Sequence, residues 1–263
     1  MNEVNKTLYI PLYGKAYVSR EGVILCDRSA ESIWERAGFK LSGKSASKWL
    51  AYYMGMRARV FDNWVTGKIG ENPDATVLHI GAGLDGRIER VGREALWYDI
   101  DFPDVISERK KYFSENGKYN MLAADVREDG WLKRISGESA IVIMEGVSMY
   151  LTPDELEKLL RGIYDRFDKV CILMDCYTVF AAKMSKIKNP INDVGVTQVY
   201  GIDDPASFEK AGLKYIGERD MTPEHLIDEL TGIEKIIFKK LYGGRMSKKL
   251  YRLYEYEKKP IIS

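Results

Sequence analysis

The sequence predicts an α/β protein in which helices cover both faces of a doubly wound, mostly parallel sheet. Between Ala75 and Asp101 a strand, a glycine turn, a helix and a second strand follow one another. After Asp101, near-continuous apolar runs alternate with helical patterns, as expected for parallel strands that are covered on both faces. With 263 residues, of which 45% are hydrophobic, the chain can bury one large core. We therefore expect a single domain spanning residues 1–263.

The segment ATVLHIGAGLDGRIERVGREALWYDID has the pattern of a nucleotide-binding unit. Gly81, Gly83 and Gly86 let the backbone approach a ligand at the start of a helix. Asp99 or Asp101, about 20 residues further on, can accept hydrogen bonds from ribose hydroxyls. The pattern alone fits NAD, FAD or S-adenosylmethionine (SAM), and also a glycine turn without a ligand.

Residues 1–72 are predicted to form a helical cap laid over the sheet. Short apolar runs near the start are broken by Pro11 and Gly14, and helical patterns follow them at 29–37 and 47–65. The turn Asn72-Pro73-Asp74 then ends the cap. The α/β core is expected to occupy residues 73–263.

The core alternates strands with helices, which implies right-handed crossovers between parallel strands. Thr152 and Glu155 form a T-x-x-E capping box with Pro153 at the first helical position. A lid insertion is expected near 177–203. Strands are expected at 120–124, 140–144, 169–175, 214–219 and 249–258, and helices at 103–113, 129–135, after Thr152, and at 177–189, 204–211 and 222–242.

Composition excludes several classes of protein. The net charge of +1 argues against nucleic-acid binding through bulk electrostatics, and the basic run 239–249 is flanked by acids, as at a solvated helix end. Three unpatterned cysteines favour a reducing, cytoplasmic setting without disulfides or a metal site. No apolar run approaches 18 residues, and no signal peptide is evident, so neither membrane nor secretion is expected. A small molecule is the expected partner.

Several ordered motifs together resemble one known family. They are TLYIPLYGKAYVSREGVILCDRSAESI, MRARVFDNWV, HIGAGLDGRIERV, WYDIDFPDVISERKKYF, AADVREDGWL and IVIMEGVSMYLTPDEL, and they span about residues 7–258. This set resembles the leucine carboxyl methyltransferase family, and within it the tetracenomycin-type polyketide carboxyl O-methyltransferases. The resemblance implies a Rossmann-like class I SAM-dependent methyltransferase fold. Its seven-stranded sheet would end in one antiparallel strand.

The resemblance also implies residues for SAM. Basic side chains would hold the methionine carboxylate, glycines would pass under the amino acid part, acids would accept the ribose hydroxyls, and further groups would contact adenine and the methionine amine. We prefer Asp101 to Asp99 for the ribose, because it is the last acid before the turn. Gly86 stands where related sequences have threonine. The basic residues are Lys15 and Arg57, the glycines are Gly81 and Gly83, and the ribose acid is Asp101 or Asp99. Asp125 and Val126 would contact adenine, and Glu145 the methionine amine.

The histidine content bears on the methyl acceptor. A carboxylate is ionised at neutral pH and needs no base, whereas a phenol with a pKa of about 10 usually does. Of the two histidines, His79 is expected in the core and His225 at the surface. The lack of an evident histidine base favours esterification of a small organic acid. We assign no catalytic side chain. Methylation of a phenolic hydroxyl, a nucleotide-dependent oxidoreductase and an inactive binding protein stay open as alternatives.

Aromatic side chains are the candidates for the acceptor pocket. Cap residues could form an aromatic lid, and residues after the fourth and fifth strands could form the opposite wall. The proposed substrate-binding residues are Tyr13 and Tyr17 from the cap and Tyr150, Tyr177 and Phe180 from the core, with Met149 beside them and Tyr9, Trp49 and Tyr53 completing the lid.

Overall fold

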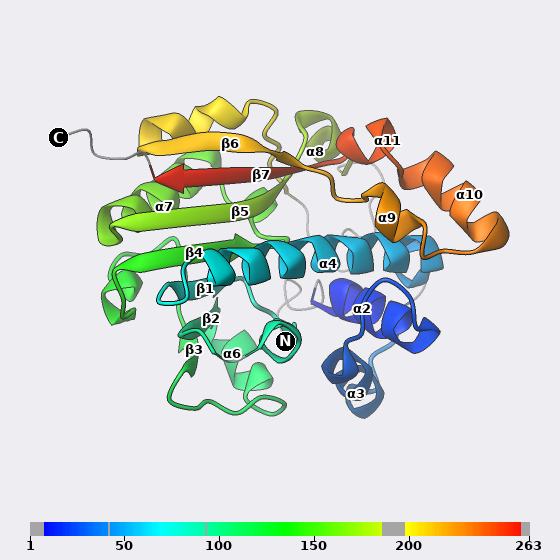
Figure 1. Cartoon of the computed structure of the whole chain (residues 1–263), viewed down its shortest axis with the longest axis horizontal. Helices are drawn as coiled ribbons and strands as arrows, with labels where there is room; N and C mark the ends of the chain where they lie inside the picture. The colour runs from blue at the N-terminus through cyan, green and yellow to red at the C-terminus, as the bar shows by residue number, and fades with distance from the viewer. Residues whose placement is uncertain (1–7, 42, 93, 186–197, 259–263) are drawn as a thin grey trace.

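The computed structural model describes residues 8–41, 43–92, 94–185 and 198–258. Their strands form one seven-stranded sheet in the order β3-β2-β1-β4-β5-β7-β6 (Figure 1). Five neighbouring strands run parallel, while β7 is antiparallel to both β5 and β6. The predicted doubly wound, mostly parallel sheet with an antiparallel last strand is confirmed.

The strands match the apolar runs of the sequence closely. They are β1 Thr76–Ile80, β2 Trp97–Asp101, β3 Tyr119–Ala123, β4 Ser139–Met144, β5 Lys169–Tyr177, β6 Leu213–Arg219 and β7 Tyr251–Lys258.

The strand register places residues of four neighbouring strands, β2, β1, β4 and β5, at the same level of the sheet. Ile80 pairs with both Ile100 and Met144, and Met144 pairs with Met174. The residues one step further are therefore, in strand order, Asp101, Gly81, Glu145 and Asp175, and they lie side by side near the carboxyl edge of the sheet.

Helices cover the two faces of the sheet and form two separate apolar cores. On one face Val77 and Ile141 pack with the cap helices, and on the other Leu78 and Val142 pack with α7, because side chains alternate along a strand. The helices are α2 Tyr9–Glu21, α3 Arg28–Ala37, α4 Lys48–Glu71, α5 Arg87–Val91, α6 Pro103–Arg109, α7 Pro153–Arg166, α8 Val179–Ser185, α9 Glu224–Ile227, α10 Gly232–Tyr242 and α11 Arg245–Lys248, with 3-10 turns at Gly43–Ala46, Trp131–Arg134, Ser148–Tyr150 and Pro205–Ala211.

The start of the cap differs from the prediction. A helix, α2, runs from Tyr9 through both Pro11 and Gly14. Pro11 is tolerated because it lies in the first turn, where the backbone amide has no intrahelical partner. Gly14 lies where α2 crosses α4, and a Cβ there would be 2.7 Å from Cβ of Met54. Pro11 therefore belongs to the first turn of α2, and Gly14 allows α2 to pack closely against α4.

The C-terminal third also departs from the predicted elements. The helix expected at 222–242 is two helices, because the chain leaves helical geometry at Thr231 and keeps Leu230 buried between them. Earlier in the chain, the helix expected at 129–135 is only a 3-10 turn at Trp131–Arg134. By contrast, the capping box of α7 is confirmed: Thr152 Oγ1 accepts from the Glu155 amide at 3.2 Å, and the Glu155 carboxylate accepts from the Thr152 amide at 2.8 Å.

The predicted lid insertion is described only in part. Its first segment is α8, which ends at Ser185, and residues 186–197 lie outside the described residues. Among the residues that the structure describes, no helix is both long and apolar enough to cross a membrane.

The crossing of α2 and α4 gives a test of this fold. Replacing Gly14 with Ala should lower the free energy of unfolding by about 1 to 3 kcal/mol, since the new methyl group overlaps Met54. Gly67→Ala is the matched control, because nothing lies within 4 Å of its Cβ position and alanine is the better helix former. It should raise stability by about 0.5 to 1 kcal/mol. Urea unfolding measures both, and equal effects of the two substitutions would contradict the close contact.

Candidate functional site

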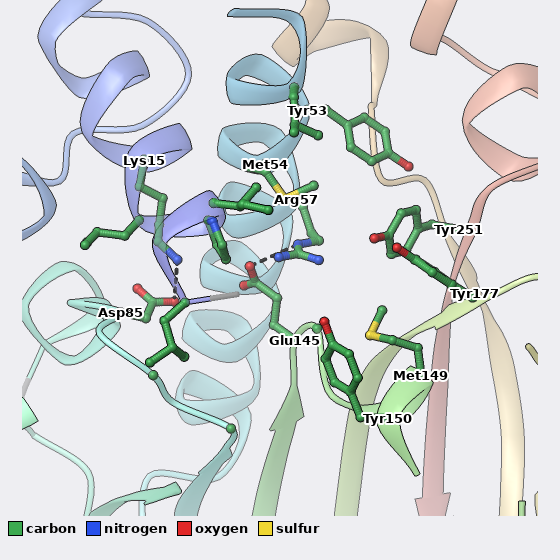
Figure 2. Close-up of a pocket in the computed structure, with 18 of the residues that line it drawn as sticks. Lys15, Tyr53, Met54, Arg57, Asp85, Glu145, Met149, Tyr150, Tyr177 and Tyr251 are labelled. Atoms are coloured by element: carbon green, nitrogen blue, oxygen red, sulfur yellow. Dashed lines mark hydrogen bonds and ion pairs between the residues drawn. The ribbon is translucent and has the colours of Figure 1, made fainter. Parts of the chain in front are cut away.

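A cavity of about 330 Å³ lies where the carboxyl ends of β1, β4 and β5 meet α2 and α4 (Figure 2). The glycine turn after β1 forms one wall, the two cap helices form another, and aromatic and methionine side chains close the far end. Its lining includes Leu8, Leu12, Lys15, Tyr53, Met54, Arg57, Gly81, Gly83, Asp85, Glu145, Met149, Tyr150, Tyr177, Met184 and Tyr251.

The glycine turn needs residues without side chains. Gly81 and Gly83 have φ of 68° and 52°, in the left-handed region. A Cβ at Gly81 would lie 2.2 Å from Val147 Cγ2, in the loop after β4. The missing side chains let Val147 and Leu8 pack against the turn, and both glycines line the cavity, where a ligand can approach their backbone.

Asp101 lies beside this turn at the end of β2. Its carboxylate accepts hydrogen bonds from the backbone amides of Gly83 and Phe102, both at 2.8 Å. Burial raises the pKa of Asp101 to about 6, although the two amides act in the opposite direction. The side chain is thus an acceptor held at the edge of the turn, where the sequence predicted a ribose acid.

Asp99 is in a different position, and its surroundings favour Asp101 as the ribose acid. The side chain is fully buried, and it accepts hydrogen bonds from Trp97 Nε1 at 2.9 Å, from Tyr119 Oη at 2.6 Å and from Arg109. Burial opposes ionisation, but Arg109 and the hydrogen bond with His79 lower the pKa of Asp99 to about 2. Asp99 holds the core together; neither it nor Asp101 lines the cavity, but Asp101 is bonded to the glycine turn, which does.

His79 is held between Asp99 and Arg87. Its Nδ1 is 2.9 Å from the Asp99 carboxylate, and its Nε2 is 3.1 Å from Nη1 of Arg87. Because arginine can only donate, Nε2 accepts and the proton sits on Nδ1. Burial lowers the pKa of this imidazole, with the hydrogen bond to Asp99 opposing. His79 is therefore the satisfied, neutral core histidine that the sequence predicted.

Lys15 reaches the glycine turn from α2. Its ammonium lies 3.1 Å from the Asp85 carboxylate, and both side chains are almost fully buried. Asp85 is also paired with Arg90 at 2.8 Å, and although burial opposes ionisation, Arg90 and Lys15 hold the pKa of Asp85 well below its usual value. An ammonium has three donors, so Lys15 can bind a ligand carboxylate while it keeps this contact.

Arg57 and Glu145 form the second buried ion pair of the cavity. Arg57 donates from Nε to Glu145 at 3.0 Å and from Nη1 to Asp175 at 2.9 Å. Glu145 is also paired with Arg87, whose guanidinium is completely buried. Burial opposes ionisation of Glu145, but Arg57 and Arg87 lower its pKa to about 2.

Gly86 has a packing role at the start of α5. A Cβ there would lie 2.8 Å from Cβ of Ser29 and 3.2 Å from Oδ1 of Asp27. Asp27 caps α3 by accepting from the Ala30 amide at 2.8 Å. The departure from threonine therefore accommodates the start of α3 against the glycine turn and removes no ligand group.

Asp125 and Val126 follow β3, outside the lining of the cavity. The half-buried Asp125 carboxylate accepts from the Arg127 amide at 3.0 Å and from its guanidinium, which lowers the pKa of Asp125. Val126 packs against the core beside α7. Their adenine contacts stay a prediction.

Tyr13 and Tyr17 do not line the cavity, so the structure gives no support to their proposed substrate role. With Tyr9 they recur every four residues and form one face of α2, while Leu8, Leu12 and Lys15 are on the side of the cavity. The tyrosine face packs against other cap side chains; the ring contacts are Tyr9 with Phe39 at 3.7 Å, Tyr13 with Trp34 at 5.1 Å and Tyr17 with Tyr52 at 5.9 Å.

The remaining aromatic candidates divide between cavity and surface. Tyr150 and Tyr177 line the cavity, as predicted, and so does Tyr53 of the proposed lid. Phe180 does not, because α8 turns it outward and leaves it 56% exposed. Trp49 also lies outside, packed edge-on against Tyr52.

Three important residues were missed by the sequence analysis. Asp85 lies inside the glycine motif itself, Asp175 lies on β5 two residues before the strand ends, and Tyr251 begins the alternating last strand. An acid at the end of a parallel strand was the available signal for Asp175. No local pattern singled out Tyr251, because only strand pairing brings β7 beside β5.

The sheet order, the bare glycine turn and the acid at the end of β2 define a SAM-dependent methyltransferase fold. A putative methyltransferase from Thermobifida fusca YX shares it, with a TM-score of 0.55 and 14% identity over 94% of each chain. Magnesium protoporphyrin IX methyltransferase from Synechocystis PCC 6803, solved with bound S-adenosylhomocysteine, aligns over 88% of this chain and 95% of its own at 11% identity, with a TM-score of 0.52.

Sequence comparison narrows this class. The chain belongs to the leucine carboxyl methyltransferase family, whose profile matches residues 11–164. It is 29% identical, over 88% of both chains, to the tetracenomycin polyketide synthesis O-methyltransferase TcmP of Streptomyces glaucescens. It is also 28% identical, over 80% of both, to the SAM-dependent methyltransferase dpfgK of Gibberella zeae. The protein is a SAM-dependent O-methyltransferase, which sets aside the oxidoreductase and the inactive binding protein.

The residues present fit SAM. Gly81 and Gly83 leave backbone open to the ligand, the Asp101 carboxylate can accept from ribose hydroxyls, and Lys15 offers a cation for the methionine carboxylate. Glu145 offers a carboxylate near the predicted position of the methionine amine.

The two acids of β2 provide a test. Asp101→Asn should weaken SAM binding by about 1 to 3 kcal/mol, because ribose hydroxyls lose a charged acceptor. The same change should stabilise the SAM-free protein at pH 8 by about 1 kcal/mol. The pKa of Asp101 is raised on folding, so its ionisation costs stability as pH rises from about 4 to 6, and asparagine does not ionise.

Asp99→Asn is the matched comparison. It should lower stability by about 3 to 5 kcal/mol, because it leaves Arg109 buried without its anion. Isothermal titration calorimetry and chemical unfolding measure the two effects. If Asp101→Asn left SAM affinity intact, the ribose assignment would be wrong.

Proposed function

We propose that this enzyme forms methyl esters on the carboxylate of a small or medium-sized, ring-bearing organic acid. The observation that carries this proposal is the state of His79, which lines the cavity but has both ring nitrogens engaged, Nδ1 by Asp99 and Nε2 by Arg87. The other histidine, His225, is exposed on α9. A carboxylate acceptor is already ionised and needs no base, whereas a phenol usually does.

The acids of the cavity support the same choice of acceptor. Asp85 and Glu145 are each held between cations, and their pKa values lie well below the usual range. A carboxylate with so low a pKa is a weak base toward a phenol. These two lining acids therefore supply fixed charge and have little capacity to remove a proton, whereas burial raises the pKa values of Asp101 and Asp175, at the edge of the site, to about 6.

For the cofactor, we propose that Lys15 balances the methionine carboxylate and that Glu145 faces the methionine amine. Gly81 and Gly83 would lie under the amino acid part, Asp101 would accept the ribose hydroxyls, and Asp125 and Val126 would contact adenine. When bound, SAM supplies a methyl group already activated on a positively charged sulfur. The residues then need only align the acceptor and exclude water.

The acceptor end of the cavity has the composition expected for a ring-bearing ligand. Tyr53, Tyr150 and Tyr177 line it, together with Met54 and Met149. Aromatic and thioether side chains bind flat apolar rings well. The name of TcmP, a polyketide synthesis O-methyltransferase, supports a polyketide-like acid.

We further propose one domain, 1–263, in which the cap 1–72 and an insertion near 177–203 enclose the acceptor. The partner is a small molecule rather than nucleic acid or membrane. A cytoplasmic setting is supported by the cysteines Cys26, Cys171 and Cys176, all of which are free.

The nature of the product tests the ester assignment. The enzyme, labelled SAM and a panel of aromatic acids and phenols should yield a labelled product that releases methanol in mild alkali, as esters do. Each acid is paired with the phenol of the same ring system as its control. A base-stable product, or activity confined to phenols, would instead establish phenolic O-methylation.

A further inference from the structure

Helix α10 carries an apolar stripe on the side that faces solvent. Ile233 and Ile236 are 73% and 68% exposed, and no other large apolar side chain among the described residues is as exposed. Together with Ile237 and Lys240 they are spaced by three or four residues, so they lie on one side of the helix. Leu241, beside this stripe, is also 48% exposed. Apolar surface gathered in this way marks an interaction site.

The opposite side of α10 is anchored to the rest of the protein. Phe238 is completely buried and stacks on Tyr242, with ring centroids 5.2 Å apart. Glu234 pairs with Lys48 at 2.5 Å and accepts from Tyr52 Oη at 2.6 Å, and both of these residues are on α4. The orientation of the helix is therefore fixed. Because a helix with apolar side chains on opposite sides is normally buried on both, the outward stripe requires a partner.

The charges at the two ends of the stripe are opposite in sign. Glu224 and Asp228 precede α10, and their side chains are 57% and 49% exposed. Each pairs with one lysine of α10, but a carboxylate has room for a further donor. At the other end, Lys240 and Arg245 are exposed, and neither forms an ion pair within the part of the chain that the structure describes. The stripe with its ends is therefore complementary in charge to a second, antiparallel copy of itself.

We infer that the outward face of α10 is the interface of a two-fold symmetric dimer of this chain, in which the two α10 helices pack antiparallel. Ile236 and Ile237 then lie near the axis, and Lys240 of each protomer lies toward the acidic end of the other. The same patch is used twice, and the net charge of +1 adds little repulsion between the copies. Figure 1 shows α10 at one end of the molecule, beside α11, where a second copy can approach it.

The interface lies behind one wall of the cavity. Tyr242, on the inward side of α10, lines the cavity, and its ring is 5.5 Å from that of Tyr53 on α4. Pairing of the outward sides therefore holds this wall in place in both protomers. The inference goes beyond the proposed function, because it does not depend on which group is methylated.

Analytical ultracentrifugation of the full chain tests the interface. Wild type should sediment as a dimer at micromolar concentration. Ile236→Glu should weaken the dimer by about 100-fold or more, because it removes an apolar contact and places two carboxylates beside the axis. Ile216→Glu is the matched control, since Ile216 on β6 is also exposed, at 43%. This variant should keep the dimer affinity within about three-fold of wild type.

Charge reversal tests the direction of the two helices. Lys240→Glu should weaken the dimer about five-fold, because it places like charges together at the edge of the interface. Adding Asp228→Lys to the same chain should restore the affinity to within about two-fold of wild type, since the two reversed charges face each other only if the helices are antiparallel. A double variant that is weaker than Lys240→Glu alone would contradict the antiparallel arrangement.

Circular dichroism and binding of S-adenosylhomocysteine verify that each variant is folded. The inference is overturned by a wild type that stays monomeric at every concentration, or by a dimer that Ile236→Glu leaves intact. A monomeric wild type that binds vesicles of phosphatidylglycerol, and loses this binding on Ile236→Glu, would assign the face to an anionic lipid surface instead. None of these measurements needs a methyl acceptor, so they decide the inference separately from the ester assignment.

Discussion

The structure depends on a chain of buried ion pairs at the carboxyl edge of the sheet. Lys15, Asp85, Arg87, Glu145 and Arg57 alternate in charge and come from α2, the glycine turn, α5, the loop after β4 and α4. Removing one partner from such a pair leaves an uncompensated buried charge, which typically costs about 3 to 5 kcal/mol. This chain of ion pairs therefore joins the cap to the sheet beside the cavity.

The same charges determine which chemistry the cavity can support. Arg87 occupies Nε2 of His79, and cations depress the pKa values of Asp85 and Glu145, so these three groups are poor bases. A reaction that needs a general base is poorly served there. Methyl transfer to an ionised acceptor requires instead that the acceptor is aligned with the methyl group and that water is excluded. Ion pairs that are already fixed in place suit this requirement, because they need not reorganise during the reaction.

Most of the fold could be predicted from the sequence because its signals are local. Parallel strands buried on both faces read as apolar runs, and the capping box of Thr152 and Glu155 acts within one turn. The predictions failed where a residue's effect depends on its position relative to a distant element. Pro11 and Gly14 suggested a break in the chain, but one lies in a first turn and the other at a helix crossing.

The candidate site was likewise predictable from the sequence only in part. The sequence by itself determined the glycine turn and an acid at the end of β2, because a nucleotide-binding turn needs both within one short unit. It could not separate Asp99 from Asp101, which lie on the same face of the strand, nor choose which face of α2 meets the cavity. Only the tertiary structure decided these, because Arg109 and Trp97 enclose Asp99 in the core and leave Asp101 at the glycine turn.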